Sequence, residues 1–174
     1  IENTLEKLQE KKSSLSLKKH EIIDLLKLNG FQRELKPFQL RDLENLISLN
    51  HGMNFSVPGA GKTTVSLALH TLLKNDKNIN LDGLIVIAPK NAFGAWDDEI
   101  EICFNESVKN KYKLTRLLGK PDNIESQITN SKKNYIINYD RFQDADIQNS
   151  IRKLLIQRKF HLILDESHKI KSES

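Results

Sequence analysis

The sequence has 174 residues, of which 38% are hydrophobic and 29% are charged, with a formal net charge of +4. This length and composition suit one globular domain with its own core, and they exclude a disordered chain. No apolar run approaches the ~20 residues that cross a bilayer, and no signal peptide is visible, so we expect no membrane association. The small basic excess fits a lysine-rich solvated surface as well as attraction to a polyanion.

Cys103 is the single cysteine, which excludes an internal disulfide and is typical of a reducing compartment. We therefore expect a cytoplasmic protein, or a nuclear one in a eukaryote. The apolar neighbours of Cys103 favour core packing over a reactive thiol. Because the sequence starts at Ile1 instead of Met and stops in a polar stretch at Ser174, we expect a monomeric piece of a longer protein.

Two apolar clusters predict helices in the first 30 residues. Ile1, Leu5 and Leu8 share one helical face, and a second cluster over residues 22–28 is followed by Gly30, a good stop signal. We expect this helical extension to lie on the domain as a helical pair, although a coiled arm to a partner is the alternative. Residues 31–174 are then the main domain.

Helices and strands alternate through the main domain. Helices are predicted at residues 38–49, 65–73, 92–104, 122–129 and around 147–155, and Asn91 is expected to cap the third of them. Strands are predicted at residues 53–57, 84–88, 112–118, 135–138 and 160–164. The continuous apolar run at 84–88 is typical of a strand buried on both faces. This order predicts an α/β fold with a mainly parallel, doubly wound sheet in three α/β/α layers.

The segment between the first predicted strand and the helix after it reads SVPGAGKT at residues 56–63. It has the layout of a phosphate-binding loop, G-x-x-x-x-G-K-S/T, with Ser56 in place of the first glycine. The glycines allow positive φ, Lys62 can reach the β- and γ-phosphates, and the Thr63 hydroxyl can ligate Mg²⁺. A plain glycine turn is the alternative, which the strand–loop–helix context disfavours. The residues assigned to ATP here are Pro58, Gly59, Ala60, Gly61, Lys62, Thr63 and Thr64.

An acidic pair follows the last predicted strand, at the edge where ligands bind open α/β sheets. Asp165 is expected to hold Mg²⁺ through its water shell, and Glu166 to act as general base on the attacking water. His168 could sense the γ-phosphate. The pair alone would fit an ordinary helix N-terminus, where acids are favoured. Together with Lys62 it supplies the parts that phosphoryl transfer needs.

Five stretches together resemble the first RecA-like lobe of superfamily-two helicases, and within it the Swi/Snf type of DNA translocase. They are LKPFQ at residues 35–39, PGAGKT at 58–63, LIVIAP at 84–89 with Trp96 and Glu99 after it, NYIINYD at 134–140, and DESHKIK at 165–171. Pro58 stands where the family usually has methionine, and Ser167 replaces alanine. The last stretch is the most family-specific, and the resemblance covers residues 31–174.

The resemblance also implies contacts made outside the phosphate loop. Gln39 would read the adenine edge, the alternative being an exposed helix residue. The strand ends would face nucleic acid, which assigns Lys90 and Asn91 after one strand and a second group after another, namely Asn138, Tyr139 and Arg141. Tyr139 could equally be a packed aromatic residue. Trp96 is interpreted as helix packing.

The function that the resemblance implies is ATP hydrolysis coupled to movement on double-stranded DNA. A second RecA-like lobe of the same protein would supply arginine fingers, so we expect one lobe alone to bind nucleotide weakly and hydrolyse it poorly. Two enzymes with the same motifs stay open, a strand-separating helicase and the motor subunit of a restriction or phage-defence system. Two further functions also stay open, a non-catalytic nucleotide-binding scaffold whose residues 1–30 dock a partner and an ATPase unrelated to nucleic acid.

Overall fold

A parallel sheet forms the centre of the molecule in the computed structural model, which describes residues 17–49, 51–54, 59–129 and 134–166. Its strands lie in the order β2-β3-β1-β4, and every pairing is parallel. Their bounds are β1 (Gly83–Ala88), β2 (Leu114–Arg116), β3 (Asn134–Asn138) and β4 (Phe160–Leu164). The predicted α/β fold is confirmed.

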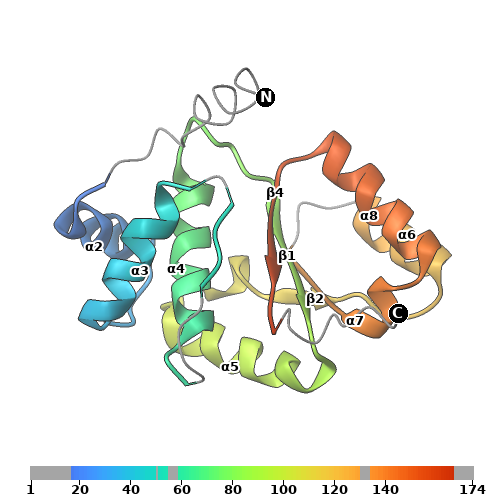
Figure 1. Ribbon diagram of the computed structural model, residues 1–174, viewed down its shortest axis with the longest axis horizontal. Coiled ribbons are helices and arrows are strands. Elements are labelled where there is room, and N and C mark those ends of the chain that lie inside the picture. Colours follow the sequence, from blue (N-terminus) through green and yellow to red (C-terminus); the bar gives the residue numbers. More distant parts are fainter. Residues whose placement is uncertain (1–16, 50, 55–58, 130–133, 167–174) are drawn as a thin grey trace, which may run out of the picture.

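Helices cover both faces of this sheet, as Figure 1 shows. On one side lie α2 (Lys19–Leu28), α3 (Pro37–Ile47) and α4 (Lys62–Asn75), and on the other α6 (Pro121–Thr129), α7 (Tyr139–Phe142) and α8 (Ala145–Gln157). The 3₁₀ turn η1 (Lys90–Ala92) and helix α5 (Phe93–Cys103) follow the carboxyl end of β1. A second 3₁₀ turn, η2 (Lys109–Lys111), precedes β2. None of the helices in the described ranges has the length and apolar character of a membrane span.

Strand β1 shows why its sequence is apolar throughout. All six of its residues are buried, because successive side chains point to opposite faces and each face carries its own core. Leu84, Val86 and Ala88 belong to the core beneath α2–α5, whereas Ile85 and Ile87 belong to the core beneath α6 and α8. The prediction of a strand buried on both faces is confirmed.

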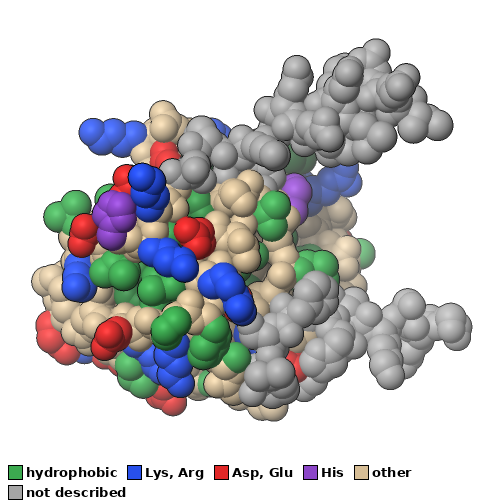
Figure 2. All heavy atoms as spheres, turned by 60° about the vertical axis from the view of Figure 1, so that its left-hand side comes forward, with side chains coloured by type: hydrophobic (Ala, Val, Ile, Leu, Met, Phe, Trp, Pro, Cys, Tyr) green, Lys and Arg blue, Asp and Glu red, His purple; other side chains and the backbone are tan. Residues whose placement is uncertain are grey.

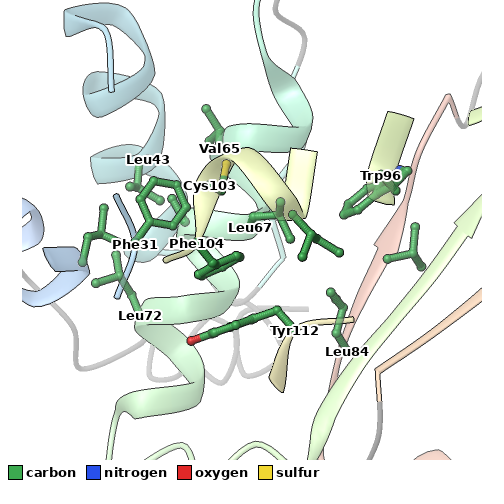
Figure 3. Close-up of a cluster of buried hydrophobic side chains, with 14 of the residues drawn as sticks. Phe31, Leu43, Val65, Leu67, Leu72, Leu84, Trp96, Cys103, Phe104 and Tyr112 are labelled. Carbon is green, nitrogen blue, oxygen red and sulfur yellow. The ribbon is translucent and has the colours of Figure 1, made fainter. Parts of the chain in front are cut away.

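Aromatic rings link α2, α5 and β2 in the first of these cores (Figure 3). Phe31 meets Phe104 edge to face, and Phe104 stacks on Tyr112 with 3.7 Å between the ring centroids. Cys103 lies fully buried in the same core, and burial, with the nearby Glu99 carboxylate, raises the pKa of its thiol. The predicted packing role of Cys103 is confirmed.

The helical extension and the first predicted strand fall partly outside the described residues. Helix α2 ends at Leu28, and Gly30 follows with φ +78°, which agrees with its predicted stop role. Residues 1–16 lie outside the description, and so do residues 55–57 of the predicted strand at 53–57. Met53 and Asn54 have no regular secondary structure.

Two local predictions were wrong. Asn91 does not cap a helix, because the Ala92 N–H bonds to the Pro89 carbonyl and winds the chain into η1 before α5 begins. Ala92 is the N-cap residue of α5 and makes no side-chain capping bond. The strand predicted at 112–118 is only the three residues of β2, since Tyr112 ends η2 and packs in the core.

Two histidines stack inside the interface between α4 and β4. His70 is fully buried, its ring lies 5.6 Å from that of His161 centroid to centroid, and neither of its ring nitrogens has a hydrogen-bond partner. Burial, then the proximity of His161 and Lys74, lowers the pKa of His70. Burial likewise lowers the pKa of His161 to about 4, although that residue keeps partial exposure. Both rings are therefore neutral near pH 7.

This pair is expected to make the fold acid-sensitive. Below the ordinary histidine pKa of 6.5, these two histidines are protonated in the unfolded chain but stay neutral in the folded chain. The free energy of unfolding therefore falls as pH drops from 6.5 towards about 4. Each buried histidine contributes a loss of about 1.4 kcal/mol per pH unit. Urea unfolding at pH 7.5 and 5.0 measures this difference. His70→Leu is expected to reduce it, whereas replacing the exposed His20 with glutamine is expected to leave it unchanged; equal pH dependence in both variants contradicts the assignment.

Candidate nucleotide and magnesium site

The N-terminus of α4 has the geometry of an anion site. The helix begins at Lys62, and its N-cap is Gly61 in the left-handed conformation (φ +78°, ψ 42°). The first turn holds no acidic residue, and the positive end of the helix dipole lies at this terminus, which favours a negative charge there. Gly59 also has positive φ, at +80°. The predicted loop conformation is confirmed in this part.

Gln39 is hydrogen-bonded to the backbone of this loop. It is only 4% exposed, its Nε2 donates to the Ala60 carbonyl at 2.8 Å, and its Oε1 accepts the Lys36 N–H at 2.9 Å. A Cβ on Gly61 would approach Gln39 Nε2 to 2.4 Å, so the close contact requires glycine there. The reading of Gln39 as an exposed helix residue is therefore wrong, while its contact with adenine stays a prediction.

Asp165, the residue directly after β4, is held in place by three hydrogen bonds. Its N–H donates to the Ile87 carbonyl at 2.9 Å and extends the pairing with β1. The Tyr139 hydroxyl donates to the Asp165 carbonyl at 2.6 Å, and Trp96 Nε1 donates to Asp165 Oδ2 at 2.9 Å. These bonds come from three different elements, so both the backbone and the carboxylate of Asp165 are oriented.

Sequence reasoning found only part of this arrangement. Trp96 is 1% exposed, which confirms its packing role, but its bond to Asp165 was missed because it joins residues 69 positions apart. Tyr139 is half-buried, and burial with the negative charges of Asp165 and Glu166 raises its pKa to about 12. Its hydroxyl therefore stays a hydrogen-bond donor at neutral pH.

Glu166 continues this turn in an unusual conformation. It is exposed and has φ +54°, in the left-handed region that costs a residue with a side chain about 1–2 kcal/mol. Such strain is found where the surrounding structure needs a side chain in one particular place. The predicted position of the acidic pair, directly after a strand, is confirmed by the bounds of β4.

Glu99 joins α5 to two other segments, the first turn of α4 and the connector before α3. Its Oε1 accepts a bond from the hydroxyl of the fully buried Thr64, and both its carboxylate oxygens accept from Arg33 Nη1, at 2.8 and 3.0 Å. Cys103 Sγ lies 3.4 Å from the same Oε1. The Thr64 hydroxyl donates to Glu99, so any contact of Thr64 with ATP would have to be made by its backbone N–H. That contact remains a prediction.

The residues predicted to face nucleic acid lie at the carboxyl ends of two strands. Lys90 and Asn91 are exposed in η1 after β1, and Asn138 ends β3 with its Nδ2 3.2 Å from Asp140 Oδ2. Arg141, by contrast, donates to the Gly119 carbonyl, so its guanidinium steadies the loop after β2. Pro58 and His168, also assigned to the site, lie outside the described residues.

All these features meet at one edge of the sheet. A short connection joins the C-terminus of α4 to the start of β1, so α4 runs antiparallel to the strands, with its N-terminus at their carboxyl ends (Figure 1). Thr63 and Asp165 carry oxygen atoms of the kind that Mg²⁺ prefers, and their role as its ligands stays a prediction. The described residues contain no cluster of three or more His, Cys, Asp or Glu side chains suited to a metal, and a magnesium ion held largely by phosphate and water needs none.

A parallel α/β sheet, a glycine-capped helix N-terminus and an acidic pair at the same edge are the features of a phosphate-loop nucleotide-binding domain. The chain belongs to the family described as type III restriction enzyme, res subunit, whose model matches residues 31–174. That family comprises ATPase domains of superfamily-two helicases, so the broad resemblance is confirmed, while the Swi/Snf subgroup is not shown. No curated protein matches the chain.

Proposed function

We propose that this chain is the ATP-binding lobe of a restriction- or defence-type motor that couples ATP hydrolysis to movement on double-stranded DNA. The family match favours this alternative over a Swi/Snf translocase. The observation that carries the proposal is the placement of the α4 N-terminus and the Asp165–Glu166 turn at one sheet edge, joined through α5. That edge is where parallel α/β sheets bind nucleotides.

Each residue at this edge has a proposed part in the reaction. The loop from Pro58 to Thr64 surrounds the phosphates, with Lys62 as the cation closest to the transferred group. Magnesium neutralises charge on the phosphate oxygens when bound, and Thr63 and Asp165 are the groups that would hold it. Glu166 takes the proton of the attacking water. Gln39 contacts adenine, and His168 senses the γ-phosphate.

The nucleic-acid surface is proposed at the same edge, around Lys90, Asn91, Asn138 and Tyr139, with Arg141 shaping the neighbouring loop. Basic and acidic side chains are mixed over the face that carries α2 and α3 and form no patch of one sign there (Figure 2). A second RecA-like lobe of the same protein would close on the nucleotide and supply arginine fingers.

One other function keeps specific support. The DESHKIK stretch at residues 165–171 resembles the Swi/Snf type of DNA translocase. A strand-separating helicase would share the same motifs. A non-catalytic scaffold is disfavoured, because the chain keeps Glu166, the candidate general base, directly after Asp165.

Duplex binding tests the proposal most directly. Lys90→Ala is expected to weaken binding to duplexes of any sequence and to lower the slope of log affinity against log salt by about 1, because one phosphate contact is lost. The matched control is Lys27→Ala, an exposed lysine on α2 that is expected to change neither value. Salt-independent binding, or the same slope in both variants, contradicts the proposed surface. A strand-displacement assay on the full-length protein separates a translocase from an unwinding helicase.

A further inference from the structure

We propose that α5 is a positioning helix, in which Trp96 orients the magnesium-binding carboxylate of Asp165 while Glu99 anchors the start of α4. The inference rests on the proposed ATPase function and concerns a helix that has no assigned contact with nucleotide. Residues three positions apart lie on one face of a helix, so one face of α5 reaches both halves of the candidate site.

Trp96 is built to orient and not merely to fill space. Its ring is 1% exposed, so it has one packed position, and its indole N–H has a single hydrogen to donate. That hydrogen goes to Asp165 Oδ2 at 2.9 Å, a charge-assisted bond that fixes the carboxylate rotation. We assign the other oxygen, Oδ1, to the water shell of magnesium. Groups that hold a metal ligand in this way typically change metal affinity by about 10–100-fold when removed.

Glu99 performs the corresponding task on the phosphate-loop side. Its carboxylate is mostly enclosed, with a side-chain exposure of 17%, and it binds both the Thr64 hydroxyl and the Arg33 guanidinium. Thr64 lies in the first turn of α4, two residues after Lys62. The position of that turn relative to α5 is therefore set by the hydrogen bond from Thr64 to Glu99, while Trp96 sets the position of Asp165 relative to the same helix.

This geometry connects the candidate nucleic-acid loop to the magnesium site. Helix α5 starts directly after η1, which holds Lys90 and Asn91, and Figure 1 shows α5 running from the end of β1 towards α4. Helix α5 is thereby continuous with the candidate nucleic-acid loop at its start and bonded to Asp165 through the Trp96 indole N–H.

The test compares ADP binding by the chain with Mg²⁺ and with EDTA. Trp96→Phe keeps an aromatic ring but loses the N–H donor together with part of the indole volume. The affinity gained from Mg²⁺ is expected to fall about tenfold, while ADP affinity in EDTA changes less than twofold. The matched control is Ile100→Val, a buried position on the same helix that loses packing without touching Asp165. If the two variants have the same Mg²⁺ dependence, the positioning role is overturned.

A spectroscopic measurement on the unmodified chain keeps the proposal testable if Trp96→Phe does not fold. Trp96 is the only tryptophan, so the chain has one indole N–H resonance. That resonance is expected to shift on adding Mg²⁺ to the ADP-bound chain and to move also in Asp165→Asn. If the resonance does not move on adding Mg²⁺ or in Asp165→Asn, the inference is overturned. If Lys62→Ala leaves the ADP affinity unchanged, the proposed nucleotide site is contradicted instead. Failure of the positioning role can therefore be distinguished from failure of the nucleotide site.

Discussion

Replacing Lys62 with alanine is expected to weaken nucleotide binding strongly while the fold persists. Lys62 is the first residue of α4, where the helix dipole and the terminal N–H groups already favour a phosphate, and its ammonium adds the nearest full positive charge. A hydrogen bond to a charged group contributes about 1.5–3 kcal/mol, so the affinity for ATP is expected to fall by about tenfold to more than a hundredfold. Titration with a fluorescent ATP analogue measures the change.

The control for Lys62 is another lysine at the first position of a helix. Lys19 begins α2, is exposed, and lies on an element outside the carboxyl edge of the sheet. Lys19→Ala is expected to retain the full affinity for ATP, and both variants are expected to keep the circular dichroism spectrum of the unmodified chain. An unchanged affinity in Lys62→Ala would refute the assignment of the phosphate loop.

The two central strands could be predicted well because they are buried on two sides. Residues 84–88 and 135–137 are continuously apolar, and a short apolar run between turn residues favours a strand buried on both faces. Shorter or edge elements carried weaker signals. Strand β2 is only three residues long, and neither its length nor the buried turn at Tyr112 follows from local composition. The cap at Asn91 was wrong because Pro89 starts a 3₁₀ turn that residue preference alone does not reveal.

The motifs of the candidate site could be predicted from the sequence, but the hydrogen bonds that position them could not. Spacing around Gly61 and Lys62 indicates a phosphate loop, and the acidic pair follows an apolar strand, because both signals are local in sequence. Their supports depend on contacts between distant residues, such as Gln39 with Ala60 or Trp96 with Asp165. Only the three-dimensional arrangement shows that Trp96 has a polar function in addition to packing.

Replacing Glu166 with glutamine is expected to leave ATP binding intact and to stop hydrolysis. Glutamine has the same shape and occupies the same left-handed backbone position at φ +54°, so the turn after β4 keeps its geometry. It cannot accept the proton of the attacking water, and general-base catalysis typically contributes about 10²–10⁴-fold. The kcat of the full-length protein with duplex DNA is therefore expected to fall by that factor, as measured by phosphate release.

The separation of binding from chemistry is what assigns Glu166 its role. A base acts only in the chemical step, so Glu166→Gln lowers kcat and keeps the Kd for ATP, whereas Lys62→Ala weakens binding first. Glu34→Gln is the matched control, because Glu34 is an exposed carboxylate in the connector before α3 and is expected to keep full turnover. If Glu166→Gln retains its turnover, the base is another residue, and if it loses ATP binding, the acidic turn serves the nucleotide as a ligand.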